Sequence, residues 1–457
     1  MSGSNKRYSL TLLVPEILSQ THNRMLPRSS LLWLTLLTAS VLPVDEDKPR
    51  VKTEFGIVEG IFKLSEPSSR RFSSFEGIPY ANPPIETLRF KPPVKLPEDL
   101  FYKPHEPLVA DKFAGACPQI DRVSGEYLGS EDCLHLNVFS PETSFTAGVR
   151  HPVMVWLHGG GFQFGSSSSE MFGPERLLEE DIVLVSLNYR LGPLGFLTTE
   201  DEAAPGNVGL LDQRLALEWI RDNIAAFSGD PDKVTLVGES SGGISVMAHL
   251  ASPASRGLFH QAIAMSGVLG ESPFLHSSKS PASYAKLLAT ELGCDASGNS
   301  EQIVNCLVSK PPKDITETGS KFSEFDFIPE PFKPVVDSWN PSPVQPFPLH
   351  EVWTKAEIPD IPLMIGGNKD EGILFILEFL KTESLYARVN EKFSTLLPAL
   401  LLGVDPEDAK RDEGETATAE VLRNSYLPGD GSLSPDAITQ MIQLFTDVHF
   451  LSPIDQV

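Results

Sequence analysis

The sequence predicts an α/β fold, in which a mostly parallel central sheet carries helices on both faces. Five short apolar runs, each ending in glycine or polar residues, are typical of strands buried on both sides. Between the second and third run, Leu210–Phe227 repeats apolar side chains every three or four residues, which indicates an amphipathic helix. This alternation predicts active residues at the carboxyl ends of strands. The five runs are Val153–Leu157, Ile182–Leu187, Val234–Val237, Gln261–Met265 and Ile361–Ile365.

The segments outside this alternation differ in composition. The stretch Ile78–Pro97 is rich in proline, which disfavours regular elements. From Glu271 to Pro348 the apolar pattern gives way to proline, serine and short helical pieces, and we interpret this part as an excursion from the sheet. A chain of 457 residues fits one large domain with insertions, and we expect residues 45–457 to form it.

The first 44 residues are expected to be an N-terminal extension with a signal peptide. Arg24 and Arg28 precede the apolar run Leu31–Leu37, and the small residue Ser40 follows, which is the zone order of a secretory leader. A buried apolar helix is the alternative interpretation of this run. A leader predicts a mature chain without a membrane span, located outside the cell or in the lumen of the secretory pathway.

Composition excludes two classes of partner. The net charge of −24 and the isoelectric point near 4.8 oppose binding to nucleic acid and to an anionic membrane surface. Four cysteines, closely spaced in two pairs, suit an oxidising compartment. Neither a metal-ligand cluster nor a dinucleotide fingerprint occurs in the sequence, so we expect no cofactor and no metal. The sequence leaves the oligomeric state open.

The strongest chemical motif is Gly238-Glu239-Ser240-Ser241-Gly242. It follows the predicted strand Val234–Val237 and precedes a helical segment, which is the context that a Gly-x-Ser-x-Gly nucleophile elbow requires. The glycines permit a strained turn that projects the serine oxygen from the sheet. A second motif, His158-Gly159-Gly160-Gly161-Phe162, ends another apolar strand. Its glycine-rich backbone can turn several amide N–H groups toward one point, as the stabilisation of an oxyanion requires, whereas a purely structural interpretation makes it a tight turn.

With these motifs in place, the chain resembles the type-B carboxylesterase and cholinesterase family of α/β hydrolases. The resemblance runs from about residue 50 to the end of the sequence. It rests on six stretches: 130–138, 158–162, 188–192, 206–213, the Ser240 motif and 367–372.

The resemblance implies an α/β-hydrolase fold and a set of site residues. Ser240 is the expected nucleophile and Glu371 the expected acid of the triad, while the amides of Gly160, Gly161 and Ser241 are expected to form the oxyanion hole. The resemblance also implies a Cys117–Cys133 disulfide, a Cys294–Cys306 disulfide and a structural ion pair between Arg190 and Asp212.

A serine hydrolase also needs a histidine that takes the serine proton, and in this fold the histidine follows the acid. Only 86 residues follow Glu371, and the Gly-x-x-His loop that the resemblance implies is not among them. We therefore expect the sequence to be truncated, with the C-terminal part of the fold missing. The one histidine after Glu371, His449, continues a helix face with Ile438, Met441 and Phe445, which favours packing over catalysis.

The resemblance implies a serine carboxylesterase that forms an acyl-enzyme with neutral carboxylic esters. Choline esters are disfavoured, because the loop between Cys117 and Cys133 lacks a tryptophan for cation–π binding. Glu239 stands where juvenile hormone esterases typically carry glutamine. The missing histidine keeps a second hypothesis open, a catalytically silent cholinesterase-like binding or adhesion protein. A triacylglycerol lipase is a third, which the sequence does not separate from an esterase.

Overall fold

The computed structural model describes residues 48–97, 106–145, 148–276, 278–323, 325, 330–340, 342–382, 384–409 and 413–457. Residues 48–457 form one compact unit. The predicted extension and signal peptide, residues 1–44, lie outside the described residues.

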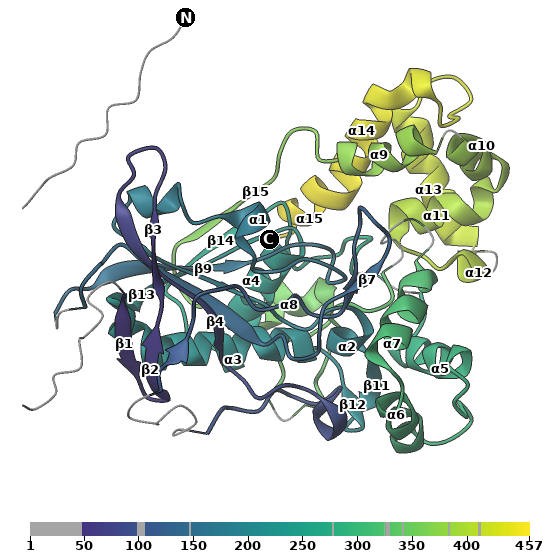
Figure 1. Ribbon diagram of the computed structural model, residues 1–457. Coiled ribbons are helices and arrows are strands. Elements are labelled where there is room, and N and C mark those ends of the chain that lie inside the picture. The colour runs from purple at the N-terminus through teal and green to yellow at the C-terminus, as the bar shows by residue number, and fades with distance from the viewer. Residues whose placement is uncertain are drawn as a thin grey trace, which may run out of the picture. The chain divides into compact units, whose positions relative to one another are not determined.

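An eight-stranded sheet forms the centre of this unit (Figure 1), with strand order β15-β14-β13-β9-β10-β8-β4-β3. The five strands from β15 to β10 run parallel, and β8, β4 and β3 continue the sheet antiparallel. These five strands coincide with the five apolar runs, which confirms the predicted α/β fold. The strands are β3 (Ile61–Leu64), β4 (Arg71–Pro79), β8 (His135–Ser140), β9 (His151–Leu157), β10 (Val183–Leu187), β13 (Gly229–Glu239), β14 (Gln261–Met265) and β15 (Leu363–Gly366).

Three smaller sheets lie outside the central one: β1-β2-β5, β6-β7 and β11-β12. Their strands are β1 (Arg50–Thr53), β2 (Gly56–Glu59), β5 (Leu108–Val109), β6 (Gln119–Ile120), β7 (Tyr127–Leu128), β11 (Thr198–Asp201) and β12 (Ala204–Pro205).

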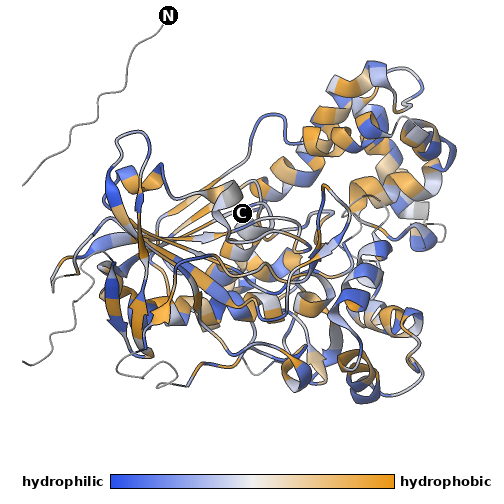
Figure 2. Cartoon of the chain, in the orientation of Figure 1, coloured by the Kyte–Doolittle hydropathy of each residue, from blue (hydrophilic) through white to orange (hydrophobic). Residues whose placement is uncertain are grey.

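Two helices pack against the parallel strands. Helix α4 (Ser241–Ala251) contacts β13, β14 and β9, and helix α3 (Val208–Asn223) contacts β13. In α3, Leu211, Leu215 and Trp219 form the predicted buried stripe, and a 3₁₀ turn (Ile224–Phe227) extends it. Figure 2 shows apolar residues concentrated on the central strands. The main core therefore fixes β13 and α4, between which Ser240 lies.

The remaining helices belong to the predicted excursion and to the C-terminal part. Helices α9 to α14 build a second apolar cluster of their own, which includes Phe375, Phe379 and Phe445. The helices are α1 (Ser169–Phe172), α2 (Gly192–Phe196), α5 (Pro281–Glu291), α6 (Ser300–Val308), α7 (Pro312–Gly319), α8 (Leu349–Lys355), α9 (Ile373–Lys381), α10 (Ser384–Glu391), α11 (Phe393–Leu402), α12 (Pro406–Ala409), α13 (Glu413–Tyr426), α14 (Ile438–Thr446), a π-helical turn (Asp447–Leu451) and α15 (Ser452–Asp455).

Candidate active site

Ser240 occupies a strained turn between β13 and α4, with φ +55° and ψ −124°. The turn is tight enough to require glycine on both sides. A Cβ on Gly238 would lie 2.3 Å from the carbonyl oxygen of Gly242, and a Cβ on Gly242 would lie 2.2 Å from that of Leu157. The Ser240 amide donates a 2.8 Å hydrogen bond to the carbonyl of Met265, which ties the turn to β14. A non-glycine residue in this conformation is rare and persists where the surrounding structure enforces it.

The glycine loop after β9 has a backbone that only glycine adopts easily. Gly160 has φ +113° and Gly161 has φ +60°. A Cβ on Gly160 would lie 2.1 Å from the carbonyl oxygen of Phe164. Among the described residues, no hydrogen bond is formed by the amide N–H of Gly160 or of Gly161. Ser241 is the first residue of α4, so its N–H has no acceptor within the helix.

These three amides and Ser240 belong to one cavity of about 920 Å³. Gly160, Gly161, Ser240 and Ser241 line it together with aromatic side chains from several segments. The structure thus brings the candidate nucleophile and the candidate oxyanion donors to the same space, at the carboxyl ends of β9 and β13. The aromatic rings are those of Phe113, Phe162, Phe164, Phe172, Phe274 and Phe450.

Glu371 follows β15, and its carboxylate is held from two sides. Oε1 accepts hydrogen bonds from the Ser266 hydroxyl (2.5 Å) and from the Asn368 amide N–H (2.7 Å) and side-chain amide (3.1 Å). Ser266 directly follows β14 and lines the Ser240 cavity. It therefore connects the candidate acid to the turn that carries Ser240. Sequence reasoning missed Ser266, although its place at the carboxyl end of a strand next to β13 is a signal that could have found it.

Glu239 adds a second carboxyl group to the cavity wall. Burial raises its pKa, and the nearby negative charge of Glu371 raises it further. The side chain lies directly beneath the glycine loop, because a Cβ on Gly159 would be 2.6 Å from Glu239 Oε2.

His158 and His249 are structural residues. The ring of His158 stacks on Tyr189 at 4.4 Å, its Nδ1 donates to the Gly159 carbonyl, and burial lowers its pKa to about 4. His249 bonds to Ser255 and Gln213 inside the core, and burial lowers its pKa to about 3.

His449 lies in the π-helical turn, where its ring stacks on Phe375 with 4.3 Å between the ring centroids. Burial lowers its pKa to about 3, with the Leu400 carbonyl opposing this shift. The prediction of a packed histidine is confirmed. Within the described part of the chain, no histidine forms a hydrogen bond with Ser240 or Glu371.

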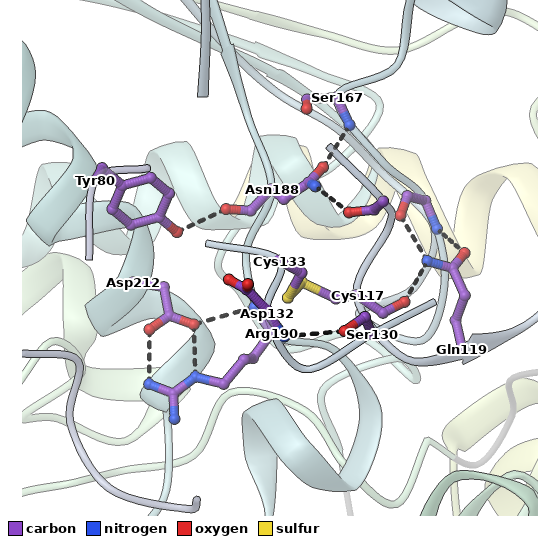
Figure 3. Close-up of a disulfide and its surroundings, with 12 residues drawn as sticks. Tyr80, Cys117, Gln119, Ser130, Asp132, Cys133, Ser167, Asn188, Arg190 and Asp212 are labelled. Atoms are coloured by element: carbon purple, nitrogen blue, oxygen red, sulfur yellow. Dashed lines mark hydrogen bonds and ion pairs between the residues drawn. A yellow bond between two sulfur atoms is a disulfide. The ribbon is translucent and has the colours of Figure 1, made fainter. Parts of the chain in front are cut away.

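Covalent and ionic links support the loops around the cavity (Figure 3). The structure contains both disulfides, Cys117–Cys133 and Cys294–Cys306, of which Figure 3 shows the first. The Gln119 side chain joins the first of them to the glycine loop, because its amide donates to the Cys117 and Gly165 carbonyls and accepts from the Gly165 N–H.

The Arg190–Asp212 pair is buried and bidentate, with bonds of 2.8 Å from Nε and 2.6 Å from Nη2 (Figure 3). The backbone N–H of Arg190 donates to the same carboxylate. The ion pair therefore fixes the loop after β10 against α3.

Two further properties concern cofactors and membranes. The described residues include no group of three histidine, cysteine or acidic side chains that could hold a metal ion. Within the same residues, no helix has both the length and the apolar character needed to cross a bilayer.

Comparison with known proteins identifies the family. The model of the carboxylesterase family matches residues 47–457. A carboxylic ester hydrolase of Bombus ignitus is 34% identical over 87% of this chain and 70% of its own length. A juvenile hormone esterase of Tribolium castaneum is 38% identical over 88% of this chain and 68% of its own. The crystal structure of juvenile hormone esterase from Manduca sexta, with OTFP covalently attached, superimposes with a TM-score of 0.75 at 29% identity, and covers 89% of this chain and 74% of that one.

The chain therefore belongs to the carboxylesterase family. Its activity class is the hydrolysis of carboxylic esters by the serine mechanism of that family, and its substrates are small-molecule esters.

Proposed function

We propose that Ser240 is the nucleophile that attacks neutral carboxylic esters and carries the acyl group. The main observation in support is the position of Ser240. It lies on a strained turn and lines the same cavity as Gly160, Gly161 and Ser241. A hydroxyl exposed at such a turn, opposite amides without internal acceptors, is the arrangement that acyl transfer requires.

The proposed chemistry assigns one step to each group. The Ser240 oxygen adds to the ester carbonyl as a histidine base takes the hydroxyl proton, and the negative charge that develops on the carbonyl oxygen is stabilised by the three amides. The tetrahedral intermediate then loses the alcohol, which takes up that proton from the base, and leaves an acyl-serine, which water hydrolyses. Glu371, held by Ser266 and Asn368, is the proposed acid of the triad, the group that orients a histidine and stabilises its charged form.

The mostly apolar cavity supports neutral esters as substrates. Esters of good leaving alcohols, such as p-nitrophenyl esters, are the preferred assay substrates, because their cleavage needs the least help from a proton donor. Within the described residues no histidine is hydrogen-bonded to Ser240, and this observation favours the second candidate, a silent binding protein.

Labelling with a fluorophosphonate probe tests the assignment. We expect the probe to form an adduct on the peptide that contains Ser240 and to leave Ser240→Ala unlabelled. Ser241→Ala is the matched control, since it removes the neighbouring hydroxyl and keeps the amide, and labelling should persist. An unlabelled wild-type protein that still binds ester ligands would support the binding-protein hypothesis instead.

We also propose that the chain is secreted or resides in the secretory lumen, with residues 45–457 as its catalytic domain. The two disulfides support this location, because such bonds persist in oxidising compartments.

A further inference from the structure

Three buried polar side chains that line the Ser240 cavity have polar atoms without a hydrogen-bond partner among the described residues. They are Ser272 (Oγ), Glu330 (Oε2) and His449 (its ring nitrogens, of which one faces the Leu400 carbonyl and the other remains for a ligand). Their exposed fractions are 5%, 3% and 2%. Buried polar atoms are normally hydrogen-bonded, because burial without a partner is costly, so these three residues are candidates to bind a polar group of a ligand in the cavity.

The three side chains line the same cavity, and together we call them the polar wall. The segment 272–276 joins its parts: Ser272 begins it, the Phe274 ring lies 5.3 Å from the His449 ring, and the His276 carbonyl accepts a hydrogen bond from Lys333. Lys333 follows Glu330 by three residues, at the end of the bend 331–333.

Each group on the polar wall is restricted in what it can bind. The His449 ring is covered by Phe375 and Phe274, so only its edge remains for a ligand. The lowered pKa keeps the ring neutral, with one nitrogen as a donor and the other as an acceptor.

Glu330 Oε1 already accepts from the Gln163 side chain and the Phe332 amide. Burial raises the pKa of Glu330 well above its usual range, although the Phe332 amide and the charge of Lys333 oppose the shift, so the environment favours the protonated carboxyl group, which can donate. Burial disfavours the charged forms of Glu330 and His449, so these groups suit a neutral polar ligand group better than a charged one. A ligand hydroxyl can both donate and accept hydrogen bonds, so it can pair with the donor and acceptor atoms of the polar wall.

We propose that the polar wall of Ser272, Glu330 and His449 binds a hydroxyl group that the ester substrate carries away from its scissile bond. This inference rests on the proposed function only in that the Ser240 cavity is the substrate site. It predicts that hydroxylated esters are preferred over their unsubstituted counterparts.

A binding experiment without hydrolysis tests the proposal. The protein is the full chain with Ser240→Ala, and the probes are ketone analogues in which a methylene group replaces the ester oxygen. One analogue is unsubstituted, and the others carry a single hydroxyl at successive positions along the acyl chain. Calorimetry should show that at least one hydroxylated analogue binds about tenfold tighter than the unsubstituted one, as one additional hydrogen bond to a buried group permits.

Two variants locate the effect. His449→Phe should abolish the tenfold gain, so that the hydroxylated and unsubstituted analogues bind with equal affinity. The thermal midpoint of this variant should rise, because a phenyl ring fits among the surrounding phenyl rings without an unpaired nitrogen. Glu330→Gln keeps a donor and should retain part of the gain. His249→Phe is the control, a buried histidine with both nitrogens paired outside the cavity, and it should lower the midpoint without changing the gain.

Equal affinity for all analogues, binding of none of them, or a gain that survives His449→Phe would overturn the proposal. None of these results depends on whether Ser240 reacts, so the fluorophosphonate test of the proposed function stays separate.

Discussion

Positive φ angles mark the residues on which the candidate site depends. Ser240, Gly160 and Gly161 all have them, at +55°, +113° and +60°. The sequence predicted these residues because a backbone with positive φ angles favours glycine, and glycines surround all three positions. It could not predict that Ser266 binds Glu371 or that Glu371 raises the pKa of Glu239, because such contacts join segments more than a hundred residues apart.

Gly160→Ala tests the glycine loop at the scale of one residue. The new Cβ would lie 2.1 Å from the Phe164 carbonyl oxygen, so the loop must shift. Its amide N–H groups would then no longer point toward the position of the oxyanion. We expect kcat/KM for a p-nitrophenyl ester to fall by about 10²–10³-fold, which is typical of a lost oxyanion donor.

Gly257→Ala is the control for this variant. Gly257 also has a positive φ, +78°, but its added Cβ would meet nothing within 4 Å. It should cost about 1 kcal/mol of stability from backbone strain and leave turnover unchanged. Wild-type turnover in Gly160→Ala would contradict the role assigned to the loop.

Among the elements, strands were easier to predict than turns. The apolar runs identified β9, β10, β13, β14 and β15, because strands buried on both faces have a continuous composition signal. The helix that carries His449 was also predicted, but its change to a π-helical turn at Asp447–Leu451 was not, since the extra residue per turn has no distinctive composition.

The two disulfides should differ in their effect on activity. Cys117–Cys133 is joined through Gln119 to Gly165 of the cavity wall, whereas Cys294–Cys306 links the segment after α5 to α6. By the chain-entropy model, replacing either pair by alanine should lower the free energy of unfolding by roughly 3 kcal/mol. Only the Cys117→Ala/Cys133→Ala protein should also lose turnover at a temperature where both variants are folded. Equal turnover in the two double variants, measured with the same p-nitrophenyl ester, would refute this link.

For the whole molecule, buried histidines predict sensitivity to acid. His158, His249 and His449 have pKa values lowered to about 4, 3 and 3. In the unfolded chain these three histidines become protonated near pH 6.5, whereas in the folded chain they become protonated only near pH 3 to 4. The stabilisation is therefore complete above about pH 6.5 and is lost as the pH falls toward the folded pKa, by about 1.4 kcal/mol per pH unit and histidine.

His449→Phe isolates one of these contributions. Between pH 6.5 and 5, the variant should lose about 2 kcal/mol less unfolding free energy than the wild type, as measured by urea denaturation at both pH values. The carboxyl groups are common to both proteins and cancel in the difference. His350→Phe, at an exposed position, should behave as the wild type does. An acid response unchanged by His449→Phe would show that this histidine is not buried in neutral form.

The central claim is that Ser240 carries the acyl group, and trapping of the acyl-enzyme tests it most directly. The protein is mixed with a p-nitrophenyl ester, quenched with acid within the first turnover, and digested for mass spectrometry. The account predicts that the mass of the acyl group appears on the peptide containing Ser240 and is absent from Ser240→Ala. An acyl group on a different residue, or ester cleavage without any acylated peptide, would contradict it.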